Sequence, residues 1–280
     1  MSNSRIKTIT IAALVLINVF FLAVIIIDAA AAVRSEREAI GNVCAILNSG
    51  GIMINPEDIT KGNGAIRTMK TSRVLEAEQV IAGAVLGPTV LTDQGVIYLY
   101  ENPERGSAEF ASAGDFEIRL NEGAITNESG TIKAVEGLLS DMALEYASLA
   151  VAFHTENGTE TVTAVCAYRE MSIFNCTITF VFSGGSLQTI RGRFVAGVEP
   201  AEDGASISHV SKALLGFLAE VRREDREDIM ALRIDKIEPG YRHRVAGSFG
   251  EGVLAPAWLI STDAGRYIID DATGEIWALG

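Results

Sequence analysis

The longest run of hydrophobic positions lies near the start of the chain. Residues 9–27 read ITIAALVLINVFFLAVIII, nineteen residues without a charge, in which only Thr10 and Asn18 are polar. A helix that rises about 1.5 Å per residue would make this run roughly 28 Å long, enough to cross a bilayer core of about 30 Å. The pattern therefore predicts a transmembrane helix within residues 8–33.

The charges that flank this run predict its orientation. Arg5 and Lys7 precede it and no acidic residue accompanies them, so by the positive-inside rule residues 1–7 stay in the cytoplasm and the rest of the chain is exported. Ala29–Ala32 offers an A-x-A cleavage site, and a cleaved signal peptide is the rival interpretation. The length of the run favours an uncleaved, single-pass anchor in the cell membrane with an extracytoplasmic C-terminal part.

Asn18 lies at the midpoint of the predicted span. An amide in hydrocarbon is stabilised by a hydrogen bond to another helix, although a long span also tolerates one Asn without a partner. Six apolar residues share a helical stripe with Asn18 and form with it the candidate partner-binding surface: Ile11, Leu14, Val15, Phe21, Leu22 and Ile25.

The segment after the alanines continues the helical pattern. Ile40, Val43, Cys44 and Leu47 recur at helical spacing, and Gly50 and Gly51 end the pattern. Residues 34–50 are therefore predicted to form a stem helix continuous with the span.

Beyond the stem, one pattern occurs three times: a short amphipathic helix followed by several strands. The helices are expected over residues 74–86, 132–142 and 207–221. The predicted fold class is thus α+β, with two to three helix-plus-antiparallel-meander units. The unit boundaries are placed at residues 51–125, 126–200 and 201–280.

The middle unit contains two of the three cysteines. Asn157-Gly158 is a hairpin signal, and period-two alternation puts Phe174, Cys176, Ile178, Phe180 and Phe182 on one face of the next strand. An odd-numbered loop near Met171 keeps both apolar faces inward and places Cys166 opposite Cys176. Export permits a disulfide between these two residues, and two buried thiols are the alternative.

Composition and motifs restrict the function. The chain has 23 Lys and Arg against 36 Asp and Glu, a net charge of −13, which argues against a nucleic-acid partner. His154 and His243 are expected on the surface, the latter after a turn at Pro239-Gly240, and no histidine or cysteine pair has zinc spacing. Turn chemistry accounts for the acidic residues near the C-terminus, Asp263, Asp270, Asp271 and Glu275. We therefore expect no enzyme, no metal and no cofactor.

The two ends of the chain resemble a known family. PAWLISTDAGRYIIDDATGEI, residues 256–276, resembles the closing hairpin of PepSY-like and YycH/YycI-type domains. The opening also looks like the YycI type, with Lys7-Thr8, one span containing a polar residue, and a charged stem that leads to Gly51-Ile52. The match covers the first fifty-odd and last twenty or so residues. The cysteine-bearing middle matches only in the order of its elements.

The resemblance implies a membrane-anchored extracytoplasmic regulator of Gram-positive bacteria. Such proteins pair with the single-span protein YycH and act on the WalK (YycG) sensor histidine kinase, a two-component system that governs cell-wall homeostasis, through transmembrane-helix and ectodomain contacts. Two other classes stay open: a PepSY-like inhibitor or chaperone of an exported protease, and a cell-envelope ligand-binding module with an apolar pocket between its units.

Overall fold

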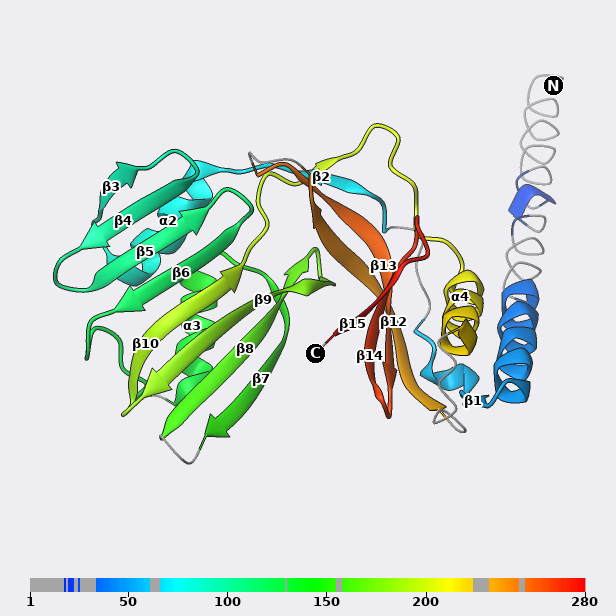
Figure 1. Cartoon of the computed structure of the whole chain (residues 1–280). Helices are drawn as coiled ribbons and strands as arrows, with labels where there is room; N and C mark the ends of the chain where they lie inside the picture. Colours follow the sequence, from blue (N-terminus) through cyan, green and yellow to red (C-terminus); the bar gives the residue numbers. More distant parts are fainter. Residues whose placement is uncertain are drawn as a thin grey trace, which may run out of the picture.

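The computed structural model describes residues 18, 20–22, 25, 34–60, 66–128, 130–154, 158–223, 232–246 and 250–279. The described strands form one connected sheet of 15 strands. This sheet is bent into two lobes that meet along β9 and β12 (Figure 1). We call the β3–β10 part with its helices the first lobe, and the remainder the second lobe.

The first lobe is an antiparallel sheet with the strand order β3-β4-β5-β6-β10-β9-β8-β7. Its strands are β3 (Val90–Asp93), β4 (Ile97–Asn102), β5 (Gly106–Ala111), β6 (Asp115–Leu120), β7 (Tyr146–His154), β8 (Thr159–Tyr168), β9 (Met171–Ser183) and β10 (Ser186–Arg193). Tight turns join most neighbours, and at Arg169-Glu170 between β8 and β9 both residues have positive φ, 48° and 68°, as a two-residue hairpin turn requires.

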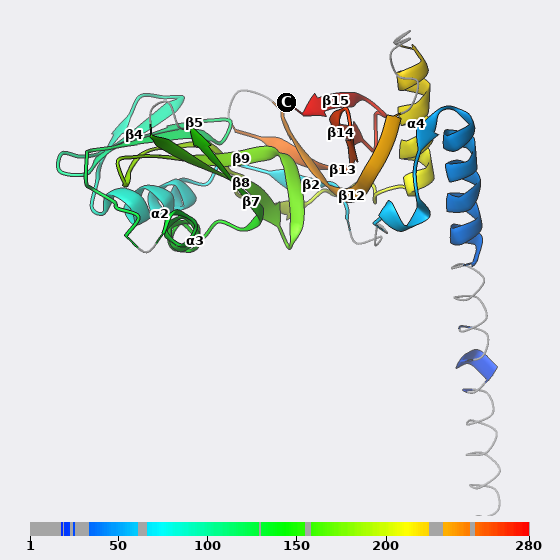
Figure 2. The ribbon, with the colours of Figure 1, turned by 90° about the horizontal axis from the view of Figure 1, so that it is seen from below.

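Two helices cover one face of this sheet, and no helix in the described part of the chain covers the other, bare face (Figure 2). They are α2 (Leu75–Leu86) and α3 (Thr131–Asp141). Strand residues that alternate inward, such as Ile178 and Phe180 of β9, pack with Ile81 and Val85 of α2 in one core. Alternation of apolar and polar residues along the strands is therefore what produces this two-layer lobe.

The second lobe draws its strands from both ends of the chain. They are β1 (Ile52–Met53), β2 (Met69–Thr71), β11 (Glu199–Pro200), β12 (Leu232–Val245), β13 (Gly252–Thr262), β14 (Gly265–Asp270) and β15 (Ile276–Leu279), and η1 (Pro56–Asp58) is a short 3-10 turn. β13 is long enough to pair with β2 through residues 252–254 and with β14 through residues 257–262, while β12 pairs along its other edge. The sheet consequently branches at β13.

Two helices cover the second lobe. The stem helix, residues 34–49, and α4 (Val210–Arg223) bury their apolar sides in one cluster with β12, β13 and β14. From the stem helix this cluster takes Ile40, Val43, Cys44 and Leu47, the positions that the sequence pattern predicted. The stem helix is therefore an integral part of the lobe's core.

The lobes are joined through the backbone of β9 and β12. The two strands pair in parallel at Ile173 and Tyr241. The Asn175 side-chain amide then donates to the His243 carbonyl and accepts from the His243 N–H, both at 2.8 Å. Gly240 makes this close approach feasible, because a Cβ there would lie 2.6 Å from the Ser172 carbonyl oxygen and 2.5 Å from Phe174 Cζ.

The expected fold class of separate helix-plus-meander units is wrong. β10 pairs with β6, so strands expected in the first and second units share one sheet, and β9 pairs with β12 of the expected third unit. The physical reason is that a short helix and a few strands bury too little apolar surface alone, whereas α2 and α3 together cover one continuous core. In the described part of the chain, strand residues outnumber helix residues.

The predicted fold class also began with a transmembrane helix within residues 8–33. No helix among the residues that the structure describes combines the length and the apolar character needed to cross a membrane. Most of the predicted span, residues 9–27, lies outside those residues.

Replacing Gly240 by alanine is expected to destabilise the protein by about 1–3 kcal/mol, the usual cost of an overpacked contact. The new methyl group would press on the Ser172 carbonyl, which belongs to the backbone and cannot rotate away. Gly137→Ala in α3 is the matched control, because nothing lies within 4 Å of a Cβ there and alanine favours a helix by about 1 kcal/mol. Chemical denaturation of both variants measures the difference, and equal stabilities would contradict the packing argument.

Candidate functional site

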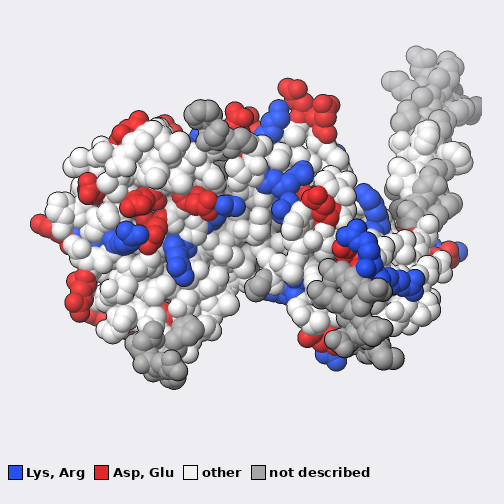
Figure 3. Space-filling model, in the orientation of Figure 1, with Lys and Arg blue, Asp and Glu red and all other residues white. Residues whose placement is uncertain are grey.

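A groove of about 620 Å³ lies where the second lobe faces the bare side of the first-lobe sheet. The molecule is visibly hollowed between its lobes (Figure 3). The walls come from β7, β8 and β9 on one side and from β12 to β15 on the other. The lining residues are Ala147, Ser148, Thr163, Val165, Ser172, Phe174, Asn175, Thr177, Lys236, Glu238, Leu259, Arg266 and Leu279.

The apolar part of the groove comes from both lobes. Phe174 of β9 packs in a small cluster with Ala257, Leu259 and Ile268, and Leu279 of β15 packs against it. The sequence pattern placed Phe174 on the same face as Cys176, which is wrong. Between the pairs Val165–Thr177 and Ala167–Ser172 the strand β9 has more residues than β8, and these extra residues change the alternation of β9 near Phe174.

Charged residues line the second-lobe wall of the groove. Lys236 Nζ forms an ion pair with Glu238 Oε1 at 2.7 Å, so these two charges cancel. Arg266 is exposed, and no described residue forms an ion pair or hydrogen bond with its side chain. In a protein of net charge −13, the groove therefore presents one uncompensated positive charge.

The strand β7 forms the border of the first lobe at the groove. Among the described residues it pairs only with β8, so its other edge has free backbone N–H and C=O groups. The strand reads YASLAVAFH and contains neither an acidic residue nor Lys, Arg or Pro. A long, uncharged strand edge is therefore available beside the groove.

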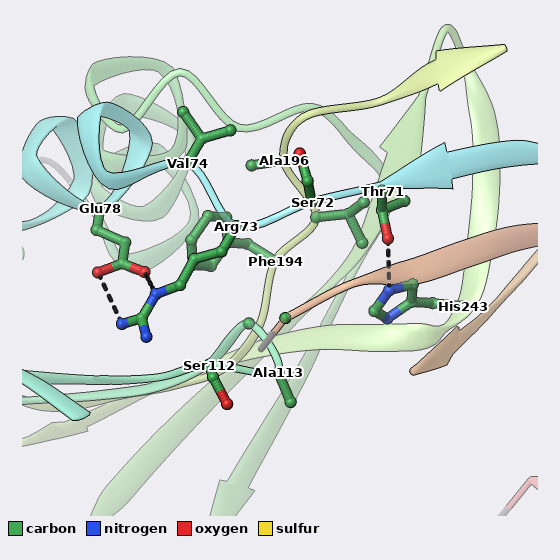
Figure 4. A pocket seen from close by; sticks show the side chains of 13 residues that line it. Thr71, Ser72, Arg73, Val74, Glu78, Ser112, Ala113, Phe194, Ala196 and His243 are labelled. Carbon is green, nitrogen blue, oxygen red and sulfur yellow. Dashed lines mark hydrogen bonds and ion pairs between the residues drawn. The ribbon is translucent and has the colours of Figure 1, made fainter. Parts of the chain in front are cut away.

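His243 lies behind the junction, on the other side of β12. It is 6 % exposed, and Thr71 Oγ1 and His243 Nε2 are 3.2 Å apart (Figure 4). Burial, followed by the neighbouring Arg193, lowers the pKa of His243 to about 4, against the opposing effect of Asp115. The expectation that His243 is a surface residue is wrong, because β12 runs straight through Pro239-Gly240 and its alternation turns His243 inward.

A small cavity of about 20 Å³ connects His243 to a buried ion pair. It has room for about one water molecule, so it is not a ligand site. Arg73 Nε donates to Glu78 Oε1 at 2.6 Å and Nη2 donates to Oε2 at 3.2 Å (Figure 4). The same guanidinium donates to the Phe110 carbonyl at 3.1 Å and stacks 4.2 Å from the centroid of the Tyr98 ring.

Burial raises the pKa of Glu78, and the hydrogen bond from Arg73 opposes this rise. Burial, with the charge of Glu78 next, also raises the pKa of Tyr100 to about 12. The pair fastens the start of α2 to the sheet.

A second buried carboxylate supports the groove wall. Asp270 of β14 is fully buried and accepts hydrogen bonds from the N–H groups of Ala272 and Thr273, both at 3.1 Å. Its Oδ2 lies 3.9 Å from Arg242 Nη1 and 3.6 Å from Arg244 Nε. Arg242 in turn lies 3.5 Å over the ring of Trp277. Asp270 therefore orders the turn that leads into β15.

The residues predicted as a partner-binding stripe are placed only in part. Ile11, Leu14 and Val15 lie outside the described residues. The other four are helical and exposed: Asn18, Phe21, Leu22 and Ile25. The stripe stays a prediction.

Cys166 and Cys176 are buried free thiols in the structure. Cys166 Sγ donates to the Arg193 carbonyl at 3.4 Å. Burial raises the pKa of the Cys166 thiol to about 12 and that of Cys176 further, which disfavours the reactive thiolate at neutral pH.

Sequence reasoning missed the groove and the Arg73–Glu78 pair. The groove residues come from segments as far apart as Ala147 and Leu279, which are 132 positions apart, and no local pattern brings such segments together. The ion pair did leave a signal, because Glu78 stands on the apolar face of the predicted helix with Ile81 and Val85. A carboxylate at such a position requires a partner.

Neither a protein-family model nor a curated protein matches this chain. Its fold is similar to that in the crystal structure of an uncharacterized protein from Eubacterium rectale ATCC 33656. The two sequences are 10 % identical, and the TM-score is 0.52 over 80 % of this chain and 88 % of that one. A likeness at this identity concerns the fold alone.

Proposed function

We propose that this protein acts outside the cytoplasm, at the cell membrane, as an accessory regulator of a sensor histidine kinase. It would bind the kinase and a second, YycH-like single-span protein, and it would catalyse no reaction itself. The resemblance of both chain ends to YycI-type proteins supports this function, and the uncharged segment over residues 9–27 supports the location.

The observation that carries the proposal is the packing of the stem helix. Leu47 is completely buried in one cluster with Leu214 and Phe217 of α4. The segment that leads from the apolar N-terminal region is therefore held in the folded core. A partner that binds either lobe can shift that segment directly, which a flexible tether would prevent.

The alternative of an envelope ligand-binding module required an apolar pocket between units. The groove instead combines apolar, hydroxyl and charged side chains. Such a mixed lining suits a polypeptide better than a lipid, which is why we prefer a protein partner.

The test inserts four residues, Gly-Ser-Gly-Ser, between Val33 and Arg34 of the full chain. The insertion is expected to leave the kinase co-purifying in mild detergent while removing the effect of the protein on kinase autophosphorylation in liposomes. Retention of the full effect would contradict the coupling through the stem helix, and failure of the unaltered chain to bind the kinase would contradict the function.

The same assay tests the stripe. Asn18→Leu is expected to weaken co-purification of the kinase, because it removes the only amide from the apolar segment. Ile17→Leu, next to Asn18 and off the stripe, serves as the matched control. Equal recovery of the kinase with both variants would remove the stripe from the proposal.

A further inference from the structure

The two edges of the first-lobe sheet differ in a way that indicates a binding role for one of them. β3 has four residues and ends in an aspartate, features that protect an edge from pairing with another chain. β7 has nine residues and carries no acidic residue, Lys, Arg or Pro. Its single irregularity is a register shift between Tyr146 and Ser148, and pairing with β8 is regular from there to His154.

Apolar side chains flank the β7 edge on the helix-covered side. Val151 is 45 % exposed and Phe153 is 63 % exposed. Phe153 is the pairing partner of Glu160, whose carboxylate accepts a hydrogen bond from Thr131 at the start of α3. The next residue of α3, Ile132, is also exposed. A strand added to β7 would cover this surface as well as satisfy the free backbone groups.

The groove adds a positive charge, that of Arg266, beside the β7 edge. Ala147 and Ser148, at the start of β7, line it together with Arg266 of the second lobe. Because Lys236 is neutralised by Glu238, Arg266 is the cation of the lining that has no ion-pair partner among the described residues. An acidic side chain on an added segment would meet it there.

The shape of the hollow favours a single segment over a second copy of the chain. β14 and β15 of the second lobe lie on the opposite side of the groove from β7 (Figure 1). A single extended strand needs about 5 Å beside its neighbour, whereas another copy would have to bring a whole lobe past β14 and β15.

We propose that the free edge of β7 receives an extended, largely uncharged segment of a partner protein as an added strand, with an acidic side chain of that segment against Arg266. The backbone supplies the affinity and the charge supplies the preference, as in other cases of strand addition. The inference rests on the proposed function in that the partner is a protein.

The probe is a fluorescent peptide of about ten alternating valines and threonines with one central aspartate. A second peptide carries lysine at the centre, and a third carries two prolines. With the full chain in mild detergent, fluorescence anisotropy is expected to show binding of the aspartate peptide, about fivefold weaker binding of the lysine peptide, and no binding of the proline peptide, which cannot complete a ladder.

Arg266→Gln is expected to abolish the preference for aspartate, and Arg233→Gln, another exposed arginine outside the groove lining, is expected to keep it. Ala150→Pro and Val151→Pro probe the edge itself. Neighbouring residues of an antiparallel strand direct their N–H groups to opposite sides. The proline that removes an N–H directed away from β8 should therefore leave the melting temperature near that of the wild type and yet prevent binding of the peptide.

Several outcomes would overturn the assignment: no binding of any peptide, equal binding of the proline peptide, or an aspartate preference that survives Arg266→Gln. If the protein is a dimer, and the β7 proline variant that keeps the wild-type melting temperature is a monomer, the edge pairs with a second copy of the chain instead. If the peptide binds as expected and the kinase does not co-purify, the groove stands and the proposed function fails. If no peptide binds and the kinase co-purifies equally with Arg266→Gln and with both proline variants, the groove assignment fails and the proposed function stands.

Discussion

Replacing Arg73 by alanine is expected to lower the free energy of unfolding by about 3–5 kcal/mol near pH 8, the cost of leaving a buried charge without its partner. Glu78 is 1 % exposed in the ion pair, and Arg73 supplies its two charge-assisted hydrogen bonds. The variant also loses the hydrogen bonds of Arg73 to the Val96 and Phe110 carbonyls. Thermal unfolding should show a drop on the order of 10 °C.

The deficit should depend on pH in a defined direction. Burial raises the pKa of Glu78 and Arg73 opposes this, so the pKa of Glu78 rises further in the variant. Protonation then removes the buried charge as the pH falls. The difference in stability between wild type and Arg73→Ala should therefore shrink between about pH 8 and pH 5.

Two controls separate the buried charge from other effects. The double variant Arg73→Met/Glu78→Leu should recover most of the lost stability, because apolar pairs of similar size replace buried ion pairs well. Arg233→Ala breaks the ion pair between Arg233 and Asp235, whose side chains are 60 % and 46 % exposed respectively. This variant should leave the melting temperature unchanged. A loss for Arg73→Ala no larger than that for Arg233→Ala would contradict the argument.

The second large effect concerns His243. Its folded-state pKa of about 4 lies below the usual value of 6.5. Above pH 6.5 the ring is neutral in both states. Below it the unfolded chain binds a proton that the folded protein excludes until about pH 4, so stability is lost as the pH falls through this window.

Between about pH 7.5 and pH 5 this linkage is expected to remove about 2 kcal/mol of stability. The matched variant is His243→Gln, whose amide can still hydrogen bond Thr71 but does not titrate. Denaturant unfolding of both proteins at the two pH values gives the contribution directly. Parallel pH profiles would show that His243 titrates normally in the folded protein.

Local structure followed from the sequence. The helices begin and end within about three residues of the predicted positions for α2, α3 and α4, because apolar spacing is a local signal, and for α2 Gly87 marks the end of the helix. The buried face of the stem helix was likewise read from Ile40, Val43, Cys44 and Leu47. Cys176, Ile178, Phe180 and Phe182 share one buried face of β9, as period-two alternation predicts.

Long-range pairing did not follow from the sequence. An odd-numbered loop near Met171 was expected in order to keep the apolar faces inward. The protein instead uses the two-residue turn Arg169-Glu170 and shifts the register between Val165 and Ala167. A turn and a bulge can each supply the same shift, and composition does not distinguish them. The error placed Phe174 in the wrong core and concealed the groove.

Pro239-Gly240 misled for a similar reason. The dipeptide is a strong turn signal, yet both residues lie inside β12. Gly240 is required there by the approach of β9, which belongs to a different part of the sequence. A glycine selected by a distant neighbour looks, in one sequence, the same as a glycine selected by a turn.

The pairing of β2 with β11 has a topological consequence. Lys70 and Met69 lie opposite Glu199 and Pro200, and the Ser72 N–H donates to the Ala196 carbonyl. The chain thus leaves the second lobe and returns to it at adjacent points. All of the first lobe thus lies between β2 and β11 in the sequence, and the stem helix, the branched sheet and α4 share a core to which it does not contribute. The groove nevertheless needs both lobes, because the β7 edge belongs to the first lobe and Arg266 to the second.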